Sequence, residues 1–119
     1  MAEAFVLGGV RTPFARYGSS LSHIRVDDLL GMTMKGACER VGVGLDQIED
    51  IVAGCVNPAH EGMGDVARWA ALAAGFPDSV PGVTINRFCG SSLSATINVA
   101  HAIRAGDLGV GIACGVESM

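Results

Sequence analysis

The sequence predicts an α/β domain: a mostly parallel sheet with helices on both of its faces. Short, continuous apolar runs, which are typical of strands buried on both sides, alternate with longer segments of helical periodicity. Half of the 119 residues are hydrophobic and 17% are charged, so the chain is too apolar to be disordered. The predicted order is β-α-β-α-β-α-β, in which crossover helices join parallel strands.

Four apolar runs are predicted to be strands. They are rich in β-branched or small residues and are bounded by glycine, proline or asparagine. They cover residues 4–10, 48–56, 83–85 and 108–116. Pro13 lies shortly after the first run and interrupts any further ladder.

The first predicted helix follows a polar, glycine- and serine-rich stretch. Asp27 and Asp28 offer an N-cap, and apolar residues then recur near helical spacing over residues 29–41 until Gly42. This length corresponds to about four turns at 3.6 residues per turn.

Two further helices are predicted by periodicity and by the glycines that end them. Residues 65–74 are alanine-rich and stop before Gly75, and residues 92–104 are followed by Gly106. The apolar face of the 65–74 helix is predicted to comprise Val66, Trp69, Ala70 and Ala73.

Composition excludes several kinds of partner. The net charge is −4 and the eight Lys and Arg residues are spread along the chain, so no basic stripe indicates nucleic acid binding. No run reaches the roughly 18 apolar residues of a membrane span, and residues 1–5 do not resemble a secretory signal. We therefore expect a cytoplasmic protein with reduced thiols. Because the chain stops directly after the last predicted strand, we also expect it to be part of a longer chain.

Three of the four cysteines and all three histidines are predicted to have no catalytic or metal-binding role. The four cysteines are 17, 34 and 25 residues apart, so no CxxC pair indicates a metal or redox site. Cys38, Cys55 and Cys114 fall on an apolar helix face or in buried strands, where cysteine packs as a small hydrophobe. No paired spacing links the histidines, so we expect solvated or core imidazoles at His23, His60 and His101.

Cys89 differs from the other cysteines because it lies between a predicted strand and the start of a long helix. Helix N-termini carry unpaired N–H groups and partial positive charge, which favour thiolate over thiol. The same N–H groups point toward any carbonyl that the sulfur attacks, as in an oxyanion hole. Gly90 leaves the sulfur uncrowded, and the hydroxyls of Ser91 and Ser92 are expected to satisfy first-turn donors.

The residues around Cys89 belong to a series of motifs with a family resemblance. The series consists of residues 10–14 (VRTPF), 17–21 (YGSSL), 86–91 (NRFCGS) and 114–119 (CGVESM). In this order they resemble the successive N-terminal signatures of the thiolase family, in particular acetyl-CoA acetyltransferases and 3-ketoacyl-CoA thiolases. Ser92 stands where the family usually has glycine, so the resemblance does not fix the fine shape of the acyl pocket.

The resemblance implies an acyltransferase of fatty acid metabolism. Residues 1–119 would be an incomplete N-terminal half-domain of a layered α/β fold, without the loop domain and the C-terminal half. Cys89 would be the nucleophile that takes the acyl group, with its backbone N–H in the oxyanion hole. Coenzyme A and acyl-CoA would be substrates, with no bound cofactor and no metal. Family members are dimers or tetramers, which implies a homo-oligomer.

In the family, a Gly-His-Pro motif and a Cys-x-Gly motif supply an activating histidine and a second cysteine. Neither motif occurs in these residues. A helix terminus alone supplies on the order of 0.3–1 kcal/mol, less than the ~1.36 kcal/mol of one pKa unit. The isolated chain is therefore predicted to have no useful turnover.

Other interpretations of the sequence stay open. Residues 62–67 fit G-x-G-x-x-A, but a loop separates them from the preceding strand and Thr84, rather than an acid, follows Gly64 by 20 residues. A non-catalytic thiolase-like scaffold or lipid-carrier relative would keep the core without a reactive thiol. Ketoacyl and hydroxymethylglutaryl-type synthases also use a helix-start cysteine, although residues 11–14 favour thiolase. Glu117 would belong either to a site beyond the strand ends or to a buried structural network.

Overall fold

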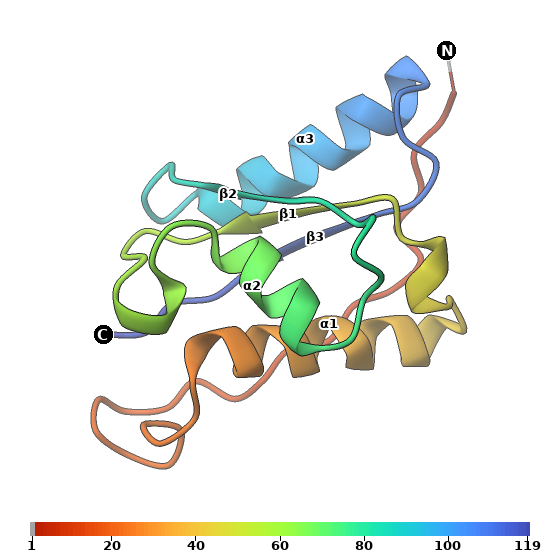
Figure 1. The fold of residues 1–119 in the computed structure, drawn as a ribbon. Coiled ribbons are helices and arrows are strands. Elements are labelled where there is room, and N and C mark those ends of the chain that lie inside the picture. The colour runs from red at the N-terminus through yellow and green to blue at the C-terminus, as the bar shows by residue number, and fades with distance from the viewer. Residues whose placement is uncertain (1) are drawn as a thin grey trace.

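A computed structural model describes residues 2–119 of the chain and contains three helices and three strands in alternation (Figure 1). Two 3-10 turns, Leu45–Gln47 and His60–Gly62, lie in the loops before and after the first strand. The elements are α1 (Val26–Val41), β1 (Asp50–Gly54), α2 (Val66–Ala73), β2 (Gly82–Ile85), α3 (Ser91–Ala105) and β3 (Gly111–Gly115).

The three strands form one parallel sheet in the order β2-β1-β3, so β1 is the central strand. Gly54 at the end of β1 pairs with Ile85 of β2 and with Gly115 of β3, which brings all three carboxyl ends to one edge. Four of the five residues of β1 are buried. A continuous apolar run was the expected pattern for such a strand.

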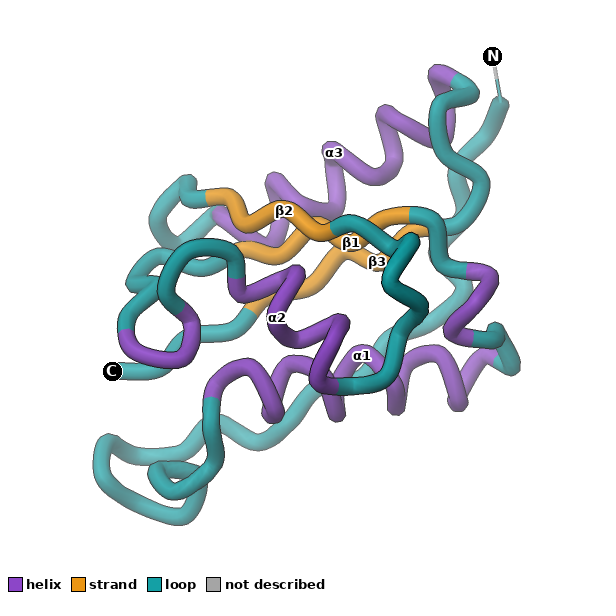
Figure 2. The backbone as a smooth tube through the Cα atoms, in the orientation of Figure 1, coloured by secondary structure: helices purple, strands orange, loops and turns teal. Residues whose placement is uncertain are grey.

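Helices cover both faces of this sheet, which confirms the predicted α/β fold class (Figure 2). α1 and α2 pack against each other on one face, where Leu30, Met34, Ile51 and Val66 are the largest fully buried side chains. α3 covers the other face through Ala95 and Val99, which pack against Val52. Full burial of each large aliphatic side chain contributes about 1.5–3 kcal/mol.

The strand predicted at residues 4–10 is wrong: this segment has no ladder hydrogen bonds and runs past the sheet as an irregular chain (Figure 1). Phe5, Val6 and Leu7 are 66–87% exposed. Gly8 lies so close to Val41 that a Cβ on it would be 2.7 Å from that side chain. A β-prone composition becomes a strand only where a neighbouring strand pairs with it, and here the segment passes the end of α1 instead.

Two details of the helices also differ from prediction. α1 begins one residue before Asp27, and its N-cap is Arg25, without a side-chain cap; the Asp27 carboxylate accepts hydrogen bonds from the Arg25 guanidinium instead. In α2 the buried face is Val66, Ala67, Ala70 and Ala71, while Trp69 is 53% exposed. Small residues face inward because α2 packs closely on both the sheet and α1.

No helix within residues 2–119 is long and apolar enough to cross a membrane.

Candidate functional site

Cys89 lies at the carboxyl edge of the sheet, in the turn that joins β2 to α3. Ile85 is the last residue of β2, Gly90 is the N-cap of α3, and Ser91 is its first helical residue. The Cys89 residue is exposed to solvent. The structure therefore brings the thiol to the head of a 15-residue helix, where N–H groups and the positive end of the helix dipole lie.

The turn that carries Cys89 is held by side chains on both sides of it. The Phe88 N–H donates to Asn86 Oδ1 at 2.9 Å, and the Arg87 N–H donates to Ser91 Oγ at 2.8 Å. The Ser91 hydroxyl donates in turn to the Phe88 carbonyl at 2.6 Å. Ser91 thus fastens the preceding turn, whereas the sequence predicted that it would satisfy first-turn donors of the helix.

Phe88, the residue before Cys89, has a φ of +46°. This left-handed conformation is unfavourable for a side chain with a Cβ, and such residues are frequent at functional sites. The surrounding hydrogen bonds hold the Phe88 backbone in this conformation, while the residue as a whole is 77% exposed. The Phe88 side chain therefore contributes little to core packing.

The first turn of α3 rests directly on the strand ends because two glycines leave room for it. A Cβ on Gly54 would be 2.5 Å from the Ser92 nitrogen, and one on Gly115 would collide with the Ser92 hydroxyl. Ser92, the residue that departs from the usual family glycine, therefore points its side chain toward the end of β3. This contact fixes the height of the helix start above the sheet.

Glu117 links the ends of two strands. Its carboxylate accepts hydrogen bonds from the Val56 N–H at 2.9 Å and the Asn57 N–H at 2.7 Å, both in the loop after β1. The residue is exposed, so it is not the buried acid that one sequence interpretation expected. Asn86 belongs to the motif quoted from the sequence but was given no role there, although Asn side chains often accept a hydrogen bond from the N–H two residues further on.

The other three cysteines have structural surroundings, as predicted. Cys38 and Cys55 are buried, and burial raises the pKa of both thiols. Cys114 places its sulfur 3.8 Å from the sulfur of Met34 and 3.7 Å from the Val52 carbonyl oxygen. Burial raises the pKa of the Cys114 thiol to about 12.

The histidines and the G-x-G-x-x-A segment do not form a site with Cys89. The three imidazoles belong to exposed residues, at His23, His60 and His101. Gly62 is buried against Val26, and Asp65 is the N-cap of α2, accepting hydrogen bonds from the Arg68 N–H and the Thr84 hydroxyl. Gly62 thus serves packing and the Asp65 carboxylate serves helix capping.

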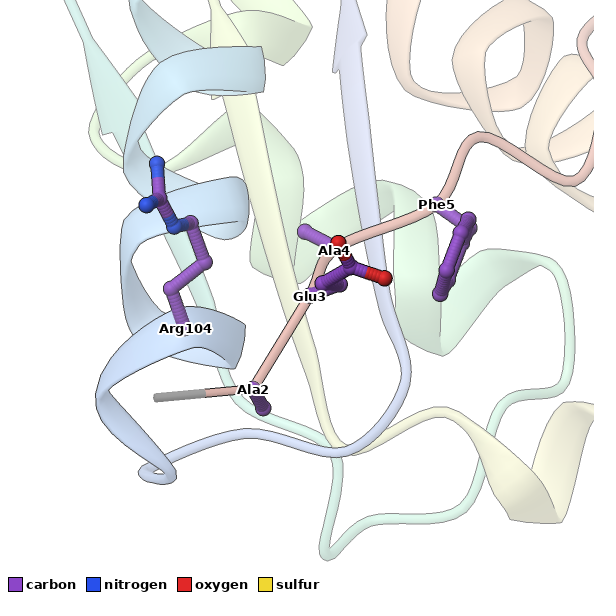
Figure 3. Close-up of a pocket in the computed structure, with 5 residues that line it drawn as sticks. All are labelled: Ala2, Glu3, Ala4, Phe5 and Arg104. Carbon is purple, nitrogen blue, oxygen red and sulfur yellow. The ribbon is translucent and has the colours of Figure 1, made fainter.

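Two depressions in the surface lie away from Cys89. One is lined by Ala2, Glu3, Ala4, Phe5 and Arg104, where the N-terminal segment passes the last turn of α3 (Figure 3). A second lies between α1 and α2, and Cys89 lines neither of them. Within the described part of the chain, no group of three His, Cys, Asp or Glu residues is placed to hold a metal ion.

These features define a class of protein. It has a parallel sheet with helices on both faces, and a thiol lies at the N-terminus of a helix beyond the carboxyl ends of the strands. The family model for the N-terminal domain of thiolase matches residues 4–119. The chain belongs to the thiolase family.

Curated relatives match along the whole chain. The chain is 48% identical over 120 residues to the 3-oxoadipyl-CoA/3-oxo-5,6-dehydrosuberyl-CoA thiolase of Escherichia coli. This match covers all of the chain and 30% of that protein. It is 46% identical to the beta-ketoadipyl-CoA thiolase of Pseudomonas aeruginosa, with 98% of this chain and 29% of that protein covered. A steroid 3-ketoacyl-CoA thiolase of Mycobacterium tuberculosis is 40% identical. The chain therefore spans about 30% of the length of these relatives.

A solved structure shares the fold. The crystal structure of Acat5 thiolase from Ascaris suum in complex with coenzyme A matches with a TM-score of 0.85 and 34% sequence identity. The match covers 90% of this chain and 28% of that chain. The thiolase-like arrangement predicted from the sequence motifs is thereby confirmed at the level of the fold.

Proposed function

We propose that this chain is the N-terminal half-domain of a thiolase that transfers acyl groups between CoA thioesters through Cys89. One observation carries the proposal: an exposed thiol in a strained turn at the head of α3. The chain's membership of the thiolase family supports this class of reaction, since its relatives are named as thiolases of 3-oxoacyl-CoA compounds. Coenzyme A and acyl-CoA are then substrates, and no bound cofactor is needed.

The proposed chemistry begins with attack of the Cys89 thiolate on a carbonyl carbon. Backbone N–H groups at the head of α3, including that of Cys89, stabilise the developing oxyanion. For a 3-ketoacyl-CoA, the carbon–carbon bond beside the keto group breaks, and the acetyl-CoA carbanion that leaves takes up a proton. The acyl group stays on the sulfur until a CoA thiol accepts it. The reverse sequence condenses two acetyl units, and covalent capture divides one difficult step into two easier ones.

Activation of Cys89 requires more than its helix. The field of a helix terminus is worth on the order of 0.3–1 kcal/mol at an exposed site, which shifts a pKa by less than one unit. We propose that a histidine and a second cysteine outside these 119 residues complete the site. The isolated chain is then inactive in turnover.

We further propose a cytoplasmic homodimer or homotetramer. Four free cysteines fit a reducing compartment. Exposed apolar side chains at Phe88, Leu93 and Ile97, 43–77% accessible, offer a contact surface beside the site. Sedimentation of the purified full gene product tests the oligomer: a monomer at micromolar concentration would contradict it.

Mass spectrometry of peptides tests the acyl-enzyme. The full gene product that contains these residues is incubated with acetyl-CoA, and one acetyl group is expected on the peptide with Cys89, removable by adding CoA. Cys89→Ser should abolish the label, whereas Cys38→Ala, which removes a buried thiol, should keep it. No label on the unsubstituted protein, or a label on Cys38, Cys55 or Cys114, would refute the proposal and favour a non-catalytic scaffold or lipid-carrier relative.

A further inference from the structure

A chain of hydrogen bonds runs from Glu117 to the turn of Cys89. The first link is the carboxylate, which accepts two N–H groups from the loop that follows β1: Oε2 from Val56 and Oε1 from Asn57. Charge-assisted bonds of this kind are stronger than neutral ones. The loop is therefore tied to the end of β3, 60 residues further along the sequence.

The second link leaves the same loop toward β2. The Val56 carbonyl accepts a hydrogen bond from Asn86 Nδ2 at 3.2 Å. The other end of the Asn86 amide, Oδ1, accepts the N–H of Phe88 at 2.9 Å. Both ends of this side chain are thus engaged, one on the loop held by Glu117 and the other on the residue that precedes Cys89.

We infer that Glu117 is a positioning residue for Cys89: through residues 56–57 and Asn86 it holds Phe88 in the left-handed conformation that places the thiol at the head of α3. The inference rests on the proposed function of Cys89. A strained φ persists only where the surroundings determine it from several sides. Here Ser91 fixes the turn from the helix, and Asn86 fixes it from the sheet edge.

Two further contacts fit a fixed carboxylate at this position. The sulfur of Cys55 lies 3.9 Å from Glu117 Oε1, and burial together with this carboxylate raises the pKa of the Cys55 thiol. Val116 also donates its N–H to the Gly54 carbonyl at 3.1 Å, which keeps the Glu117 backbone against the end of β1.

The alternative is that Glu117 only fastens two strands, and the chain contains a matched control for that role. Glu49, just before β1, accepts a hydrogen bond from the Gly109 N–H at 2.8 Å, just before β3. It is also an exposed carboxylate bound to backbone of the neighbouring strand segment, but at the opposite, amino edge of the sheet. Its loss should weaken the sheet without reaching Cys89.

The experiment compares Glu117→Gln with Glu49→Gln in the full gene product. Each glutamine keeps one acceptor oxygen, but at position 117 its NH₂ group opposes one of two N–H donors. The acetylation rate of Cys89 is measured against acetyl-CoA concentration. For Glu117→Gln we expect the rate at saturation to fall by about 10- to 100-fold, as for a misplacement approaching 1 Å, with an unchanged half-saturating concentration. Glu49→Gln should leave both values unchanged.

Coupling to Asn86 separates positioning from general weakening. In an Asn86→Ala background, Glu117→Gln should cause no further loss of acetylation rate, because the link it acts through is gone. Amide hydrogen exchange supplies a readout that needs no thioester chemistry: the Phe88 N–H should exchange at least about tenfold faster in Glu117→Gln than in Glu49→Gln.

The outcomes distinguish the two proposals. Equal acetylation rates and equal Phe88 exchange in the two glutamine variants, or additive losses with Asn86→Ala, overturn the positioning role even if Cys89 is acetylated. If the unsubstituted protein is not acetylated, the proposed function fails. Faster exchange of the Phe88 N–H in Glu117→Gln than in Glu49→Gln would then still support the hydrogen-bonded connection. Equal exchange in the two variants would overturn that connection.

Discussion

Replacing Gly54 by alanine should lift the start of α3 from the sheet. A Cβ at this position would be 2.5 Å from the Ser92 nitrogen and 2.6 Å from the Ser91 carbonyl carbon, whereas ordinary contact begins at 3.4 Å. The shortfall is 3.4 − 2.5, or about 0.9 Å. Both atoms belong to the helix backbone, so no side-chain rotation relieves the collision.

The expected cost follows from this geometry. An extra methyl group in a packed interior destabilises by about 1–3 kcal/mol, and backbone atoms as the collision partners favour the upper end. In the full gene product, this should lower the Tm by a few degrees. A displacement of the helix start near 1 Å should also slow acetylation of Cys89 by about 100-fold, measured well below the Tm.

Gly36→Ala is the control for this prediction. Gly36 lies in α1, and a Cβ there meets nothing within 4 Å. The same substitution should therefore raise stability by about 0.5–1 kcal/mol through helix propensity. Thermal unfolding by circular dichroism and the acetylation rate are measured for both variants. If Gly54→Ala unfolds at the wild-type temperature, or if Gly36→Ala is destabilised as much, the reasoning from close approach is wrong.

Three shorter predictions concern other features. Iodoacetamide near pH 8 should alkylate Cys89 and leave the three other cysteines unmodified. The reason is that burial raises the pKa of Cys114 to about 12 and raises the pKa values of Cys38 and Cys55 above their usual value. Peptide mapping measures the labelling, and equal labelling of all four cysteines would contradict the prediction. The Arg25 guanidinium holds the pKa of Asp27 below its usual 3.8, so this ion pair stabilises the fold above pH 3.8 and the stabilisation is lost as the pH falls through the lowered pKa. Asp27→Asn should therefore reduce the loss of unfolding free energy between about pH 5 and pH 2. An acid unfolding profile equal to that of the unsubstituted protein would contradict this prediction. Phe88→Asn should be more stable than Phe88→Ile by about 1 kcal/mol in urea unfolding, because Asn tolerates a positive φ and a β-branched residue does not; a more stable isoleucine variant would contradict this.

The sequence predicted the elements whose signals are local. α3 was expected from its periodicity and from Gly106, which adopts a φ of +85° as the C-cap. β1 was expected from a continuous apolar run, and its last four residues are buried. The position of Cys89 between β2 and α3 followed from the same local pattern.

The failures share a physical cause, which is dependence on a distant partner. Residues 4–10 have the composition of a strand, but a strand exists only where another offers ladder hydrogen bonds, and here the segment passes α1 instead. Trp69 has the helical spacing of a core residue, yet α2 approaches its neighbours too closely for an indole. The connection from Glu117 to Asn86 depends on three strand ends meeting, which no local pattern records.

Close approach of backbones explains three of the glycines in the strands, of which Gly54 and Gly115 lie at the edge that carries Cys89. Gly82 of β2 leaves room for the backbone of α2, since a Cβ would be 2.8 Å from the Arg68 nitrogen, and Gly54 and Gly115 do the same for α3. The first turn of α3 rests directly on the backbone of the strand ends, so it cannot move closer to the sheet edge. The turn that carries Phe88 and Cys89 leads directly into this first turn of the helix. Gly54 and Gly115 at the strand ends thus let the first turn of α3, which follows Cys89 directly, pack against the strand backbone.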